Sequence, residues 1–114
     1  MPRPQKERII RYVPPVFYFK PAGIPLRELE EVILHFDELE SLRLVEWQGK
    51  SQIEAAKKMG VSRVTLQRIL HSAHKKIAES ILFGKALRVE GGKIKILSNK
   101  NLKQIKEDPK QNLG

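Results

Sequence analysis

The chain has 114 residues, with 22 Lys and Arg against 13 Asp and Glu, so it carries a net charge of +9, and it contains no cysteine. The length is that of one domain, and the lack of cysteine excludes disulfides, thiolate metal sites and thiol nucleophiles. No stretch approaches the roughly 18 apolar residues of a membrane span, and the basic start lacks the apolar run of a signal peptide, so we expect a cytoplasmic protein. The positive charge indicates a polyanionic partner, either nucleic acid or an anionic membrane surface, although a lysine-rich surface that only confers solubility also fits.

Residues 1–25 are predicted to form a basic, proline-rich arm that packs on the core. They hold six of the seven prolines, and proline disfavours helix at its own position and at the preceding one. The apolar run from Val16 to Phe19 predicts an extended stretch against the core. A turn at Pro21-Ala22-Gly23 follows it.

Residues 21–50 carry most of the acidic side chains and have a net charge of −4. Residues 26–36 fit either a short helix or a strand over residues 32–34, and we favour the helix. Asp37 then predicts the N-cap of a second helix, with Glu40 three residues on, as in a capping box. We expect the apolar side chains of this helix to face the core and its charged side chains to face solvent; the former are Leu39, Leu42, Leu44 and Val45, and the latter are Glu38, Glu40, Arg43 and Glu46.

Residues 51–70, SQIEAAKKMGVSRVTLQRIL, predict two helices that meet at a tight turn. Ser51 and Ser62 are N-caps, and Gly60 permits the positive φ that ends the first helix. The second helix is predicted to run from Arg63 to about Phe83. The inward residues of the two helices are expected to form a small core with the helix before them; they are Ile53, Ala56, Leu66 and Leu70. The apolar stripe along the second helix is Leu66, Ile69, Leu70, Ala73, Ile77 and Ile81.

This helix–turn–helix places polar side chains on the outward face of its second helix. A helix fits the DNA major groove, where Arg bonds guanine, Gln bonds adenine and an apolar side chain contacts the thymine methyl. The candidate base-reading residues are Arg63, Val64, Gln67, Arg68 and His71. The candidate phosphate contacts are Lys57, Lys58, Ser62, Thr65, Lys75 and Lys76. An ordinary helical corner that binds no nucleic acid also fits the pattern.

The residues after the helical domain, which spans 26–84, predict a small β-hairpin over residues 85–97. Leu87 and Val89 alternate with polar residues, as do Ile94 and Ile96, and Gly91-Gly92 lies between the two runs. Residues 98–114 are predicted to be a polar, basic and mobile tail. The predicted fold is therefore mainly α, with a helix-turn-helix core, an extended arm and a C-terminal hairpin.

No sequence feature indicates an enzyme, a cofactor or a metal site. His71 and His74 lie one helical turn apart, but no acid or cysteine accompanies them, so a surface or phosphate-facing role is favoured over metal binding. The chain has no Walker loop and no dinucleotide-binding glycine motif. The dense carboxylates of residues 28–46 fit solvated helix faces.

Several motifs resemble known families. The residues 51–70 resemble the promoter-reading fourth region of bacterial sigma factors. The segments FKPAGIPLRELEEVIL, DELESLRLVE and GKALRVEGG, together with an initial Pro-Arg-Pro and the helix–turn–helix, resemble UPF0251, an uncharacterised family of small predicted DNA-binding proteins. The resemblance covers residues 1–92 and implies a sigma-region-4-like core and a role in transcription. Members often carry a cysteine near the basic arm, which this chain lacks.

The favoured function is that of a sequence-specific double-stranded DNA-binding protein that regulates transcription. The alternative is a protein-interaction module of the transcription machinery that uses the same helical corner, and an RNA-binding role ranks third because aromatic content is only 6%. A homodimer is a further expectation, since helix-turn-helix proteins commonly bind as dimers. The acidic segment 28–46 is a candidate contact with the transcription machinery.

Overall fold

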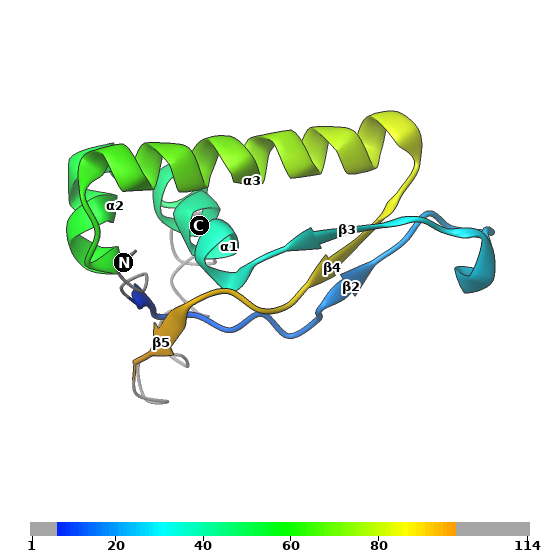
Figure 1. Ribbon diagram of the computed structural model, residues 1–114, viewed down its shortest axis with the longest axis horizontal. Helices are drawn as coiled ribbons and strands as arrows, with labels where there is room; N and C mark the ends of the chain where they lie inside the picture. The colour runs from blue at the N-terminus through cyan, green and yellow to red at the C-terminus, as the bar shows by residue number, and fades with distance from the viewer. Residues whose placement is uncertain (1–6, 98–114) are drawn as a thin grey trace, which may run out of the picture.

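The long helix α3 (Arg63–Phe83) organises the fold (Figure 1). A computed structural model describes residues 7–97 of the chain. The first half of α3 packs against the two short helices α1 (Phe36–Ser41) and α2 (Gln52–Met59), and its second half extends over a small sheet. The predicted tail over residues 98–114 lies outside the described residues.

Five short strands form two separate sheets. In the first, β4 (Ala86–Val89) is central, with β3 (Glu31–Leu34) parallel to it on one side and β2 (Tyr18–Phe19) antiparallel on the other. In the second, β1 (Arg8–Ile10) pairs in parallel with β5 (Ile94–Ile96). The mainly α prediction is therefore right only in part, because residues 7–97 combine three α-helices with these strands.

The core consists of two adjoining apolar clusters. One joins the short helices to the start of α3 and contains Leu44, Ala55, Ala56, Met59, Leu66, Ile69 and Leu70. The other joins the middle of α3 to the sheet through Ala73, Leu34 and Val89. Together they fix α3 along its first three turns, and the support becomes thinner toward its C-terminal end.

The helix predicted over residues 26–36 is wrong, since this segment contains a strand. Only a single 3-10 turn, η1 (Leu26–Glu28), precedes β3. Val32 and Leu34 are buried on the face of β3 that α3 covers. The partner strand β4 lies more than fifty residues further along the chain, and this pairing decides between two local patterns that were otherwise equally good.

The hairpin predicted over residues 85–97 is also wrong. Its two halves are strands, but β4 and β5 belong to different sheets. Gly91 and Gly92 have φ values of 73° and 100°, and they carry the chain close past the start of α1, where Phe36 N–H donates to Gly91 O at 3.1 Å. A Cβ on Gly92 would lie 3.1 Å from His35 Cβ, so these glycines serve a close crossing rather than a two-residue turn.

The helix predicted to start after an Asp37 cap begins at Phe36 instead, so its N-cap lies two residues earlier than expected. His35 is the N-cap of α1, and Glu38 Oε1 accepts a hydrogen bond from His35 N at 2.8 Å. The pair of Asp37 and Glu40 does not form the capping box. After α1 the chain continues as a π-helical segment, η2 (Leu42–Trp47), before Gly49 turns it toward α2.

The charged face of α1 and η2 is not solvated as expected. Glu38, Glu40 and Arg43 are buried, and only Glu46 is exposed. The extended arm covers this face: Arg11 N–H donates to Glu40 Oε2 at 3.1 Å, and Arg43 forms two hydrogen bonds to the same carboxylate. The sequence pattern predicted a surface helix with one solvated face, but the arm covers one side of the helix and α3 covers the other.

The arm packs on the body as predicted, although only partly. Ile10 is fully buried, but Val16, Phe17 and Phe19 remain about half exposed. None of the helices within residues 7–97 combines the length and apolarity that crossing a membrane requires.

Candidate nucleic-acid interface

Two helices and a three-residue turn form the candidate interface. α2 ends at Gly60, which has a φ of 70°, and α3 begins at Arg63. Gly60 N–H donates to Lys57 O at 3.2 Å and Val61 N–H donates to Ala56 O at 3.0 Å. These bonds satisfy the last carbonyls of α2, and the left-handed glycine reverses the chain without steric cost.

Both helices have the predicted serine caps. Ser51 Oγ accepts from Glu54 N at 3.1 Å, and Glu54 Oε1 accepts from Ser51 N at 3.3 Å, which completes a capping box. Ser62 Oγ accepts from Thr65 N at 3.1 Å. Ser62 therefore fixes the residue at which α3 begins.

Small residues allow α2 and α3 to approach closely. Ala55 and Ala56 are both buried between the helices, together with Leu66 and Leu70. The prediction that Ile53 faces this core is wrong, because its side chain is 57% exposed. Ala55 takes the inward position expected for Ile53, so α2 is rotated about its axis relative to the predicted packing.

The predicted base-reading residues lie together on one exposed face of α3. They are Arg63, Val64, Gln67, Arg68 and His71, all of them exposed. Their spacing repeats every three or four residues, which aligns them along one side of a helix over about 12 Å. Within residues 7–97, none of the four polar members forms an internal hydrogen bond or ion pair. This face is therefore sterically and chemically available.

The predicted phosphate contacts lie on α2, at the start of α3 and one turn beyond His71. Lys57 on α2 and Lys75 on α3 are exposed, and Lys58 is half-buried. Ser62 and Thr65 lie at the start of α3, where Ser62 Oγ is already bonded to the backbone and the hydroxyl of Thr65. The two serine and threonine hydroxyls thus have a structural role in addition to any contact with a ligand.

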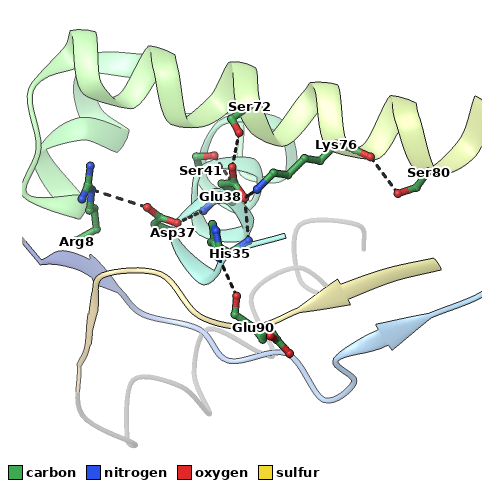
Figure 2. Close-up of polar contacts among 9 residues, drawn as sticks. All are labelled: Arg8, His35, Asp37, Glu38, Ser41, Ser72, Lys76, Ser80 and Glu90. Carbon is green, nitrogen blue, oxygen red and sulfur yellow. Dashed lines mark hydrogen bonds and ion pairs between the residues drawn. The ribbon is translucent and has the colours of Figure 1, made fainter. Parts of the chain in front are cut away.

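Lys76 differs from these contacts. Its ammonium points into the molecule, where Nζ lies 2.8 Å from Glu38 Oε1 (Figure 2). Ser72 Oγ donates to the other oxygen of the same carboxylate. Lys76 is therefore not a free phosphate contact, because the buried carboxylate of Glu38 competes with any ligand for its ammonium group.

Glu38 joins α1 and α3 in one polar cluster, through hydrogen bonds from Ser72, Lys76 and the His35 backbone. Its side chain is only 7% exposed. Burial raises the pKa of Glu38, but the hydrogen bonds from Lys76, Ser72 and the His35 backbone together lower it by more. The pKa of Glu38 therefore lies below its ordinary value. The carboxylate is therefore charged at neutral pH and anchors the middle of α3 to α1.

Most of the acidic segment is used inside the protein. Glu31 pairs with Arg88 at 2.8 Å and accepts from Tyr18 Oη at 2.7 Å. Glu46 Oε2 lies 2.6 Å from His74 Nε2, which turns this histidine toward η2. The hydrogen bonds of Arg88 and Tyr18 lower the pKa of Glu31. The segment 28–46 therefore offers few unpaired carboxylates to a partner.

The arm contacts the turn between α2 and α3, which was not predicted from the sequence. A Cβ built on Gly60 would lie 3.4 Å from Ile9 Cδ1, so β1 reaches the corner between α2 and α3. Arg8 on the same strand lies with its Nε 3.8 Å from Asp37 Oδ2 at the start of α1 (Figure 2). The only local signal for this contact is the adjacent apolar pair Ile9 and Ile10 between the charged residues Arg8 and Arg11.

The comparisons with known proteins identify relatives but no structure. A family model described as "Protein of unknown function DUF134" matches residues 1–97. A "UPF0251 protein" of Halothermothrix orenii is 52% identical over 96 residues, which cover 84% of this chain and 71% of the relative. No solved structure matches the chain.

Two further relatives are similarly close. A "UPF0251 protein" of Moorella thermoacetica is 54% identical over 92 residues, which cover 81% of this chain and 62% of the relative. A "UPF0251 protein" of Caldanaerobacter subterraneus is 55% identical over 96 residues, which cover 84% of this chain and 81% of the relative. The resemblance drawn from the motifs is thus confirmed: the chain belongs to the uncharacterised DUF134 (UPF0251) family.

Proposed function

We propose that the protein binds double-stranded DNA in a sequence-specific manner and regulates transcription. In this account α2, the turn and α3 form a DNA-binding helix-turn-helix, and the start of α3 enters the major groove. An α-helix is about 10–12 Å across, and the major groove of B-DNA is about 12 Å wide. The second helix of such a motif is the one that contacts base edges.

The observation that carries the proposal is the unobstructed polar face of α3. Arg63, Gln67 and Arg68 are exposed and unpaired within residues 7–97, directly after a capped helix start. An Arg side chain can bond the O6 and N7 of guanine together, and Gln can do the same with N6 and N7 of adenine. Val64, which is 52% exposed, is placed to contact a thymine methyl group.

Exposed cations near the face of α3 from Arg63 to His71, here called the reading face, support a duplex rather than a single strand. Lys57 on α2 and Lys75, one turn beyond His71 on α3, are exposed, and such side chains contact phosphates and position a protein on a duplex. Single-stranded recognition relies on aromatic side chains that stack on bases. The reading face contains none, so we rank RNA below duplex DNA.

Regulation of transcription is the role that such binding would serve. The runner-up is a protein-interaction module that uses the same corner, and it predicts no measurable DNA binding at moderate salt. A contact between residues 28–46 and the transcription machinery stays a prediction, and most carboxylates of this segment also have partners within the protein.

The direct test is the binding of a fluorescent random-sequence duplex, followed by anisotropy at several salt concentrations. We expect binding that weakens steeply with salt, because each neutralised phosphate releases counterions. Glu54→Gln on the exposed side of α2 is a control for a change in charge outside the proposed contacts. A lack of binding at low salt by the full chain contradicts the proposal and favours the protein-interaction module.

A further inference from the structure

We propose that the C-terminal end of α3, with the apolar groove beside it, is a surface through which two copies of this chain associate. The inference concerns the opposite end of α3 from the reading face. It does not depend on DNA binding, and the test below contains no DNA.

The last turn of α3 exposes three consecutive apolar side chains. Ile81 is 75% exposed, Leu82 is 73% exposed and Phe83 is 71% exposed. Consecutive helix residues point about 100° apart, so the three cover most directions around the helix end. The predicted apolar stripe is not covered here: Ile81 was expected in the core, but its side chain is largely exposed. Folded monomers rarely expose such a contiguous apolar patch.

An apolar groove lies directly beside this helix end. It has a volume of about 510 Å³ and lies between α3 and the edge strand β2; its lining includes Phe19, Pro21, Ile77, Ile81 and Leu87. A second hollow of about 500 Å³, whose lining includes Tyr12, Leu39 and Trp47, meets it at Ile77. The two hollows therefore follow one side of α3 between the helix and the extended arm.

The projecting helix end and the receiving groove lie on the same molecule and side by side. A two-fold symmetric contact requires a surface that is complementary to itself. If Leu82 and Phe83 of one copy enter the groove of the other, the same contact forms twice. The occupant that this arrangement fits is therefore a second copy of the chain.

The area agrees with this occupant. Ile81, Leu82, Phe83 and Phe19 together expose on the order of 600 Å², taking about 150–250 Å² for a large apolar side chain. Specific interfaces bury from about 600 Å² on each partner, so this apolar surface reaches the lower end of that range. Association would also remove from solvent the three most exposed large apolar side chains within residues 7–97.

The charges around the patch permit two copies to meet. The chain as a whole carries +9, so most of its faces repel a second copy. Beside the patch, however, Lys85 is neutralised by Glu79 at 2.8 Å, and Lys20 Nζ donates to Pro21 O. α3 is about 31 Å long, so association at its C-terminal end keeps the basic reading faces apart.

The first experiment measures the mass of the full chain by sedimentation or light scattering at micromolar concentrations. We expect a dimer for the natural sequence. The double variant Leu82→Glu/Phe83→Glu should be monomeric or show a dissociation constant raised by roughly 30-fold or more. These residues are over 70% exposed, so circular dichroism should show an unchanged fold. The matched control is Ile53→Glu, another exposed apolar position on α2, which should remain dimeric.

The second experiment uses the absence of cysteine from the chain. The single variants Leu82→Cys and Phe19→Cys are mixed and oxidised, and we expect a mixed disulfide between the two chains. Ile53→Cys mixed with Phe19→Cys should give far less cross-linking. A natural chain that is monomeric at about 100 μM, or a dimer that survives Leu82→Glu/Phe83→Glu, overturns the inference.

Discussion

Lys76 Nζ on α3 lies 2.8 Å from Glu38 Oε1 on α1, and this ion pair ties α3 to the centre of the molecule. Ser72, one turn earlier on α3, donates to the same carboxylate. The two contacts fix both the position of α3 along its axis and its rotation. The rotation matters for function, because it decides which side chains α3 presents to solvent.

The first prediction concerns this ion pair. Lys76→Met removes the charge that balances the buried Glu38, so we expect the free energy of unfolding to fall by about 3 kcal/mol. Lys75→Met at the exposed neighbouring position should change it by less than about 0.5 kcal/mol. Urea unfolding of the two variants checks the difference, and equal stabilities would show that the ion pair has no structural weight.

The second prediction concerns acid. Because the pKa of Glu38 is lower in the folded chain than its ordinary value of 4.5, the unfolded chain binds more protons as the pH falls below that value. The stability that Glu38 provides is thus present above about 4.5 and is lost as the pH falls through its folded pKa. Thermal unfolding between neutral pH and pH 3 should show a shallower loss for Glu38→Gln than for the natural chain. Glu30→Gln, an exposed change of the same kind, should keep the natural slope.

The third prediction compares two glycines of positive φ. Gly92 has a φ of 100°, and a Cβ there would lie 3.1 Å from His35 Cβ and 3.2 Å from Asp37 Oδ1. Gly84 has a φ of 64° and open space around it. Gly84→Ala should therefore cost about 1 kcal/mol, the backbone cost alone, and Gly92→Ala about 2–3 kcal/mol. Equal losses in chemical denaturation would contradict the close crossing at the start of α1.

The fourth prediction separates the exposed candidate phosphate contacts, Lys57 and Lys75, from the paired Lys76. Lys57→Ala and Lys75→Ala should each weaken binding to every duplex and reduce the slope of affinity against salt by about 1. Lys76→Met should leave the slope unchanged, because that ammonium is paired with Glu38. Anisotropy titrations across a series of salt concentrations measure this. A slope that falls for Lys76→Met as much as for Lys57→Ala would mean that Lys76 leaves Glu38 to bind DNA.

Local chemistry made the corner between α2 and α3 predictable. The caps at Ser51 and Ser62, the left-handed Gly60 and the bounds of α3 are as expected, because each depends on neighbours within four residues. The same holds for the exposed face from Arg63 to His71, which follows from the helical period once Leu66 and Leu70 are buried.

Long-range pairing made the rest unpredictable. Residues 31–34 become a strand because β4 lies beside them, and β5 joins β1 instead of turning back on β4. Glu40 is buried because the arm supplies Arg11 N–H as a donor. Each of these outcomes depends on a partner at least 29 residues away, which no local pattern specifies.

Selection of binding sites from random duplex DNA tests whether the start of α3 reads bases. The natural chain and Arg68→Ala are carried through the same selection. We expect the natural chain to enrich a defined motif, and Arg68→Ala to lose preference at one base position, at a cost of about 1–3 kcal/mol for the preferred base. An identical motif with unchanged affinity for Arg68→Ala, or no enrichment by the natural chain, would contradict the account.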